Sequence, residues 1–152
     1  MSELRDLYQE MILDHGKRPR NFGPLGAANR EAKGHNPLCG DKLTVMLLIE
    51  NGRIADVRFE GAGCAISMAS ASLMSEAIKG KSEADVRAMF EKFHVGLTAA
   101  EETTGNAALA DLDKLAVFSG VREYPIRVKC ATLPWHTLIA ALERAPQPVK
   151  TE

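Results

Sequence analysis

Apolar side chains near the start of the chain recur at intervals of three and four residues, which is typical of a helix with one buried face. This helix is expected to end at Gly16, with Pro19 beyond it. Residues 17–37 are rich in Gly, Pro and Asn, and they predict an irregular segment that holds one short strand. The apolar positions that define the helix are Leu4, Leu7, Tyr8, Met11 and Ile12.

Two runs of alternating apolar and polar residues, 43–49 and 55–59, predict a β-hairpin. A two-residue loop at Asn51-Gly52 would pair Leu47 with Asp56 and Val45 with Arg58, which mixes the apolar and polar faces. A three-residue loop that begins at Glu50 pairs residue 47 with residue 55 and keeps one apolar face. We therefore expect the three-residue loop, in which Gly52 supplies the left-handed residue.

After Cys64 the period changes, and the rest of the chain predicts helices. The first of them stops at Gly80, and one of its faces is small and polar. The next helix begins at Ser82, with Asp85 three residues later in a capping-box arrangement. The small polar positions of the first helix are Ser67, Ser70, Ser72 and Ser75.

The last third of the chain predicts a loop, a short helix and a long final helix. Residues 96–106 are polar and loop-like, and leucines at 109–115 indicate the short helix. The final helix should start close to Cys130, because Pro134 is tolerated only in a first turn, and it should end at Pro146. The order of helix, sheet and helices predicts an α+β fold, with a small antiparallel sheet packed against several helices.

Composition narrows the classes of protein that the chain can belong to. It has 152 residues, of which 45% are hydrophobic and 26% charged, so we expect one globular domain over 1–145 and a tail over 146–152. With 19 basic and 20 acidic residues the net charge is −1, which argues against a general nucleic-acid binder. No apolar run is long enough for a membrane span and no secretory signal is visible, so a cytoplasmic protein is expected.

Three cysteines lie at the boundaries of predicted elements, and none lies in an apolar stripe. An odd number in a cytoplasmic protein argues against disulfides. The expected hairpin places Cys39 opposite Gly63 and Asp41 opposite Gly61, so that Cys39, Asp41 and Cys64 converge at its open end. The glycines there allow close approach.

Cys130 would join this group if the positive end of the final helix stabilised its thiolate. Three thiolates and one carboxylate suit tetrahedral Zn²⁺ or an iron–sulfide cluster. The alternative is that the cysteines are buried core residues, since no Cys-x-x-Cys pair is present.

Arg127 and Lys129 are candidates to stabilise the thiolates or to contact a partner. His35 is a spare ligand; a Cys39–His35 nucleophilic pair would lack an orienting group.

Four segments stand in order along the chain: Asp14-His15 with Pro19-Arg20-Asn21-Phe22-Gly23, Asn36-Pro37-Leu38-Cys39-Gly40-Asp41, Gly61-Ala62-Gly63-Cys64-Ala65-Ile66-Ser67 and Lys129-Cys130-Ala131-Thr132-Leu133. Together they resemble the U-type iron–sulfur cluster assembly proteins. The resemblance is closer to the SufU branch than to the IscU branch, because Lys129 stands where IscU has His and the stretch between the last two cysteines is longer.

The resemblance implies a zinc site formed by Cys39, Asp41, Cys64 and Cys130. It also implies a pyridoxal-phosphate cysteine desulfurase of the SufS type as the partner that supplies persulfide sulfur. Cys39 is the expected acceptor, because its loop is bounded by Pro and Gly and is the most mobile of the three positions.

Three functions remain open at this point. The first is a zinc-containing sulfur acceptor, closer to a sulfurtransferase than to an enzyme acting on small molecules. The second is a scaffold on which a transient iron–sulfur cluster is built and passed to apoproteins or carriers. The third is an interaction module with structural zinc, against which a carboxylate ligand argues. No nucleic-acid or membrane partner is expected.

Overall fold

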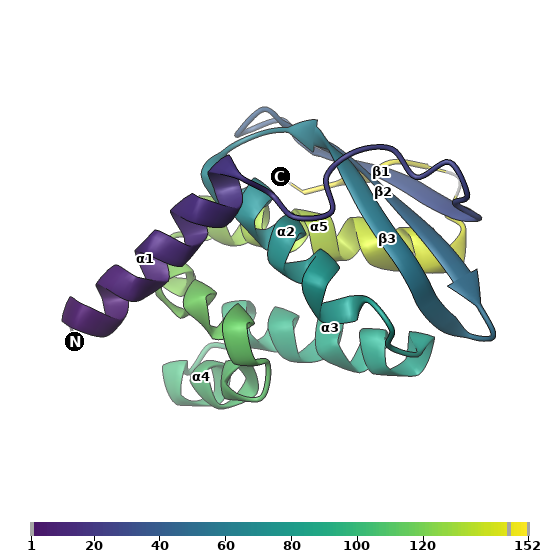
Figure 1. The fold of residues 1–152 in the computed structure, drawn as a ribbon. Helices are drawn as coiled ribbons and strands as arrows, with labels where there is room; N and C mark the ends of the chain where they lie inside the picture. The colour runs from purple at the N-terminus through teal and green to yellow at the C-terminus, as the bar shows by residue number, and fades with distance from the viewer. Residues whose placement is uncertain (1, 146, 152) are drawn as a thin grey trace.

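The computed structural model of the chain describes residues 2–145 and 147–151. It is an α+β fold, as predicted (Figure 1). In chain order its elements are α1 (Ser2–Lys17), β1 (Arg30–Asn36), β2 (Asp41–Glu50), β3 (Arg53–Ala62), α2 (Ala65–Ile78), α3 (Glu83–Thr98), α4 (Glu102–Ala110), the 3₁₀ helix η1 (Asp113–Glu123), α5 (Pro125–Glu143) and β4 (Val149–Lys150). Within the described residues, no helix has the length and apolar character needed to cross a membrane.

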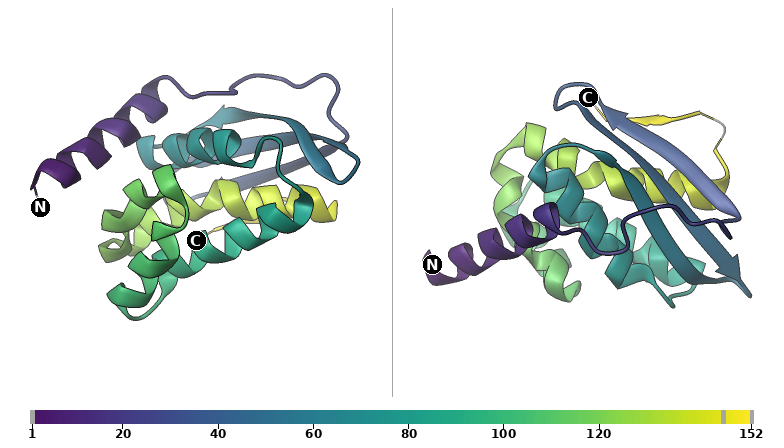
Figure 2. Two further views of the ribbon diagram at one scale, coloured as in Figure 1. Left: turned by 60° about the horizontal axis from the view of Figure 1, so that its bottom comes forward. Right: turned by 45° about the horizontal axis from the view of Figure 1, so that its top comes forward.

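One sheet lies over a layer of helices (Figures 1 and 2). Its strand order is β3-β2-β1-β4; β1, β2 and β3 are antiparallel, and β4 runs parallel to β1. Helix α5 packs against β1 and β2, and α2 packs against β3 and α5. The hairpin and the short preceding strand are thus confirmed. The short strand β4 lies in the segment expected to be a tail, and the division at residue 145 stays a prediction.

The hairpin has a two-residue loop, so the expected three-residue loop is wrong. Asn51 and Gly52 have φ of +54° and +75°, the left-handed values of a turn that matches the twist of the strands. The register shifts by one residue next to Leu48, so Leu47 faces Val57 and not residue 55. The two-residue loop alone would shift the strand pairing by one residue and mix the two faces. The bulge shifts the pairing by one further residue, so the apolar side chains of both strands stay on one face.

Helix α5 begins at Pro125, five residues earlier than expected, and carries Pro134 in its interior. The missing N–H of Pro134 leaves the carbonyl of Cys130 without its helical donor. In the same turn the hydroxyl of Ser70, from α2, donates a 2.5 Å hydrogen bond to the carbonyl of Ala131. Helix α2 thus packs and hydrogen-bonds against α5 at the turn that Pro134 interrupts. Cys130 lies in the second turn of α5 and not at its positive end.

Most of the expected loop at residues 96–106 is helical. Helix α3 continues to Thr98, and α4 begins at Glu102. The two helices pack closely because Gly96 has no side chain, and a Cβ there would overlap the side chain of Leu109. The predicted start at Ser82 is confirmed, since its hydroxyl accepts a hydrogen bond from the N–H of Asp85.

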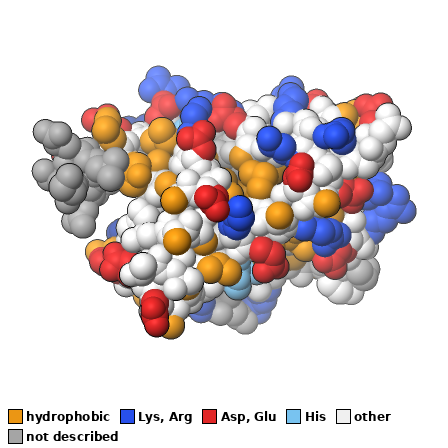
Figure 3. All heavy atoms as spheres, turned by 90° about the horizontal axis from the view of Figure 1, so that it is seen from below, with side chains coloured by type: hydrophobic (Ala, Val, Ile, Leu, Met, Phe, Trp, Pro, Cys, Tyr) orange, Lys and Arg blue, Asp and Glu red, His pale blue; other side chains and the backbone are white. Residues whose placement is uncertain are grey.

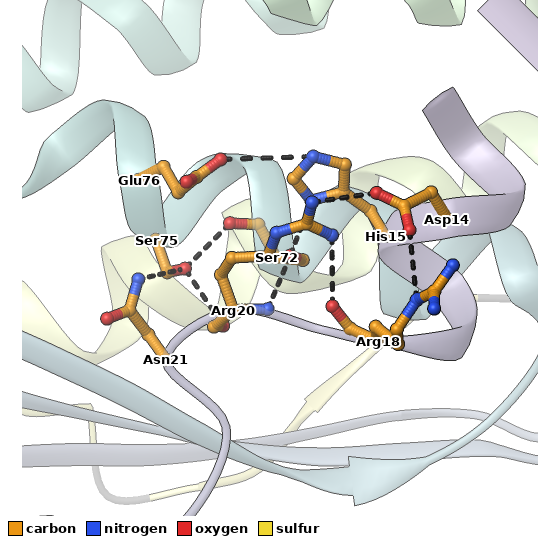
Figure 4. Close-up of polar contacts among 8 residues, drawn as sticks. All are labelled: Asp14, His15, Arg18, Arg20, Asn21, Ser72, Ser75 and Glu76. Carbon is orange, nitrogen blue, oxygen red and sulfur yellow. Dashed lines mark hydrogen bonds and ion pairs between the residues drawn. The ribbon is translucent and has the colours of Figure 1, made fainter. Parts of the chain in front are cut away.

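The small polar face of α2 is buried against the end of α1 and the segment that follows it (Figure 4). His15 Nδ1 lies 2.7 Å from the hydroxyl oxygen of Ser72, which also accepts a 2.8 Å hydrogen bond from the N–H of Arg20. The side-chain amide of Asn21 donates to the hydroxyl oxygen of Ser75 at 2.9 Å. These hydrogen bonds at the end of α1 add to the packing of Tyr8, Met11 and Ile12 against the hydrophobic core.

Candidate metal centre

The turn at residues 37–40 connects β1 to β2 and carries Cys39. Gly40 adopts φ +70°, which L side chains disfavour. Asn36 organises the turn: its side-chain oxygen accepts a 3.1 Å hydrogen bond from the N–H of Leu38, and its carbonyl accepts one from the N–H of Cys39. Cys39 is therefore half-buried at the tip of the turn, while Leu38 is 60% exposed.

Asp41 is the first residue of β2, and its side chain is buried. One carboxylate oxygen accepts a 2.8 Å hydrogen bond from the N–H of Cys64. Leu43 faces Gly61 in the hairpin, so Asp41 lies beside Gly63 and not opposite Gly61 as expected. A Cβ at Gly63 would overlap the Asp41 carboxylate. The close approach predicted for this end of the hairpin is confirmed, with a different glycine.

Cys64 is the N-cap residue of α2. Its sulfur accepts a 3.5 Å hydrogen bond from the N–H of Ser67, and its thiol donates to the second carboxylate oxygen of Asp41 at 3.8 Å. The chain leaves β3 through Gly63 and enters the helix directly, so the position of Cys64 is fixed by two elements at once.

Cys130 is buried on the face of α5 that packs under the sheet. Its thiol donates to the sulfur of Cys39 at 2.9 Å, and the amide of Asn36 donates to the Cys130 sulfur at 3.6 Å. Burial, with hydrogen bonds to Cys39 and Asp41 and the nearby charge of Cys64, raises the pKa of the Cys130 thiol well above its ordinary value. The expected stabilisation of this thiolate by a helix end is wrong, because α5 begins one turn earlier.

The ligand atoms of Cys39, Asp41 and Cys130 all lie within 4.8 Å of one another. Cys64 is adjacent to Asp41 but falls outside this group, so its sulfur must turn from the helix cap toward the other three to complete a four-ligand site. Among the described residues, no Lys or Arg forms an ion pair with Asp41. A buried carboxylate beside thiols and without a cationic side chain fits a bound metal cation, which would balance the charge.

The two basic residues expected to support the site lie in different environments. The exposed Arg127 places its guanidinium 4.6 Å from the centre of the Tyr124 ring. Lys129 is half-buried and lines a cavity between α3 and α5. His35, the spare ligand, lies on β1 outside the group of clustered ligand atoms.

Asn36 is the site residue that reasoning from the residues overlooked. It is fully buried, shapes the turn of Cys39 and contacts the sulfur of Cys130. An Asn three residues before the turn cysteine is a recognisable sign of a side chain that bonds the backbone two residues on. Ser67, which the helical pattern places on the polar face, also donates its N–H to the Cys64 sulfur.

Comparison with known proteins assigns the chain to a family. The sequence model described as the NifU-like N-terminal domain matches residues 7–131, a span that contains all three cysteines. The chain belongs to this family. The resemblance to U-type iron–sulfur assembly proteins is thereby confirmed.

Full-length relatives carry two different names. The chain is 38% identical over 137 residues to the zinc-dependent sulfurtransferase SufU of Bacillus subtilis, covering 90% of each chain. It is 34% identical over 145 residues to the iron–sulfur cluster assembly scaffold protein IscU of Streptococcus pyogenes, covering 95% of this chain and 88% of the relative.

The fold is also that of solved relatives. A crystal structure from Fervidobacterium islandicum, described as an iron–sulfur cluster assembly scaffold protein for the SUF system, matches with a TM-score of 0.74 and 36% identity. The match covers 88% of this chain and 94% of that chain.

Proposed function

We propose that this NifU-like domain is a zinc-containing sulfur acceptor that takes persulfide sulfur from a SufS-type cysteine desulfurase. The observation that carries the proposal is the placement of Cys39 at the tip of a turn, 2.9 Å from the sulfur of the buried Cys130. One thiol is thus accessible to a partner, while its neighbours are held inside the fold. The 38% identical relative named a zinc-dependent sulfurtransferase supports the same assignment.

The metal site consists of Cys39, Asp41, Cys64 and Cys130 in this proposal. Zinc, when bound there, keeps the thiols deprotonated and therefore nucleophilic at neutral pH. The chain's own contribution is positional. Asp41 is oriented by the N–H of Cys64, and Cys130 is oriented by the amide of Asn36.

Sulfur transfer then needs one nucleophilic step at Cys39. The Cys39 thiolate attacks the terminal sulfur of the partner's cysteine persulfide, which forms a new S–S bond on Cys39. The partner's own S–S bond breaks, and its cysteine leaves as a thiolate. No external oxidant or reductant is consumed, because the persulfide sulfur changes carrier without a net redox change.

Exposed side chains close in sequence to the cysteines supply a docking surface for the desulfurase. Leu38 is 60% exposed in the turn of Cys39, and Ile126 and Tyr124 are 56% and 48% exposed where α5 begins. Arg127 stacks on Tyr124 and adds a positive charge beside these apolar groups. Apolar and aromatic groups with an arginine are typical of interface centres.

The proposal is tested by mapping persulfide onto individual cysteines by mass spectrometry after incubation with a desulfurase and cysteine. We expect modification at Cys39. Cys39→Ala should abolish enhancement of desulfurase turnover and keep the fold. Cys64→Ala and Cys130→Ala should lose metal, and activity with it. Persulfide on Cys64 or Cys130 in a fully active Cys39→Ala variant contradicts the assignment.

A scaffold function uses the same residues and is supported by the relatives named as cluster assembly scaffolds. In that case an iron–sulfur cluster would be cargo, built on the cysteines and passed to apoproteins or carriers. Anaerobic reconstitution followed by transfer to an apoprotein tests this role. A purely structural zinc module would show neither sulfur acceptance nor cluster transfer.

Location and further partners belong to the same proposal. We place the protein in the cytoplasm, with the desulfurase and the acceptors of its sulfur as partners. Neither nucleic acid nor a membrane surface is a partner in this proposal, in keeping with the net charge of −1.

A further inference from the structure

The cavity that Lys129 lines has a volume of about 510 Å³ and lies between α3, the end of η1 and the outer side of α5. Its lining includes Lys129, Arg122, His94 and His136, and the C-terminal segment that contains β4 closes one side. None of the described residues that line it is acidic. Charges of both signs are interspersed over the helical face in Figure 3, so a lining with only basic charges is a local departure from the rest of that surface.

Arg122 contributes a fixed positive charge. Its guanidinium donates to the carbonyls of Gly96 and Ala99 at 2.6 and 2.7 Å. Gly105 makes room for it, since a Cβ there would overlap the guanidinium. Carbonyl partners orient a guanidinium without neutralising it. Within the described part of the chain, neither Arg122 nor Lys129 forms an ion pair.

Two imidazoles lie beside these charges. The rings of His94 and His136 are 5.6 Å apart, and Phe90 packs against both at 5.7 and 5.3 Å. Neither ring forms a side-chain hydrogen bond with a described residue. Burial and the neighbouring His94 lower the pKa of His136, so at neutral pH it is a neutral ring with one N–H to donate.

We propose that this cavity binds a phosphate group, either free phosphate or the phosphate of a small organic ester. The positive charges of Arg122 and Lys129, with two imidazole donors, suit a dianion, whereas a metal cation would be repelled by the same charges. The apolar side chains of Leu97 and Val128 also line the cavity and would contact the organic part of an ester. The volume lies in the range of small-molecule sites.

This site is distinct from the cysteine centre. Val128, Lys129, Thr132 and His136 recur at helical spacing along the cavity side of α5, while Cys130 belongs to the buried side that faces Cys39. The proposal does not depend on the sulfur-acceptor function.

The experiment follows the histidine ring signals of metal-loaded protein by NMR at constant ionic strength. Inorganic phosphate, phenyl phosphate and acetate are titrated in parallel. We expect saturable shifts of His94 and His136 with both phosphates but not with acetate. Tighter binding of phenyl phosphate identifies an ester as the ligand, and equal binding identifies free phosphate.

Two variants and one control test whether the cavity is the phosphate-binding site. Lys129→Gln should weaken phosphate binding by about fivefold or more, and His94→Gln provides a second test if Lys129→Gln folds poorly. Lys92→Gln is the matched control, because Lys92 is an exposed lysine of α3 that pairs with Asp111 outside the cavity. Non-saturable shifts, equal affinities in Lys129→Gln and Lys92→Gln, or a response at His35 instead of the two cavity histidines would each overturn the proposal.

Discussion

Gly63 is the residue whose replacement probes the candidate metal centre most directly. A methyl group at this position would overlap the carboxylate of Asp41 and lie 2.7 Å from the hydroxyl oxygen of Ser67. Neither neighbour is a flexible chain end in solvent. Both are buried, and the N–H of Cys64 holds the Asp41 carboxylate in place. Gly63→Ala must therefore displace the carboxylate or the start of α2.

The expected cost is that of inserting a methyl group into a packed site, about 1–3 kcal/mol. For a chain of this length each kcal/mol corresponds to about 2–4 °C in melting temperature, so Gly63→Ala should melt about 2–12 °C below the wild type. Because Asp41 is a proposed ligand, the variant should also bind less than one metal ion per chain, and metal should raise its melting temperature less than that of the wild type.

The assay is thermal unfolding with and without metal, together with metal analysis of the purified protein. Gly120→Ala is the matched control, because its Cβ would meet nothing within 4 Å. A second control adds Asp41→Ala, which removes the nearer of the two clashing groups; Gly63→Ala should then cost less than it does in the wild type, so the two effects should not add in full. Full metal binding with unchanged melting in Gly63→Ala, or additive effects in the double variant, would refute the reasoning.

Two further predictions concern the metal and the contact between α1 and α2. Removal of the metal by a chelator should lower the melting temperature, because the ligands join the hairpin to α5 and binding stabilises only the folded state; an unchanged transition in demonstrably metal-free protein would show that the site is uncoupled from folding. Burial lowers the pKa of His15 below its ordinary value of 6.5, mainly by desolvation and then through Arg20, so the unfolded chain binds more protons and stability should fall as the pH drops below about 6.5. His15→Gln should reduce this dependence in unfolding experiments across pH 5–8, and an identical slope in both proteins would rule out His15 as its source.

The predicted convergence of Cys39, Asp41 and Cys64 depended on a hairpin register that places the apolar side chains of both strands on the same face of the sheet. The loop length was wrong, yet the apolar alternation was strong enough that a bulge preserved it, and the ends of the strands still met. The bulge is at Ala55, which is exposed, so the buried positions of β3 are Ile54, Val57 and Phe59 and not 55, 57 and 59. The expected alternation assumed a hairpin without a bulge, and it therefore placed Asp41 opposite the wrong glycine.

Contacts that join distant segments explain the other differences. Pro134 argued for a late start of α5 because an isolated helix cannot absorb an interior proline, whereas here Ser70 donates into the affected turn. The approach of Cys130 to Cys39 spans 91 residues, and its geometry depends on how α5 packs under the sheet. The serine face of α2 predicted polarity correctly, but polarity alone did not indicate burial beneath α1.

Cys64 serves the helix and the candidate metal centre with the same sulfur atom. As the N-cap of α2 it accepts the N–H of Ser67, one of the donors that a helix start otherwise leaves to water. When that sulfur turns toward Cys39 and Cys130, the first turn of α2 must share its acceptor or release it. Metal binding at the centre should therefore change the hydrogen-exchange rate of one backbone amide, that of Ser67. Measuring this rate would show whether the site holds a metal ion, holds a different cation, or is losing its metal.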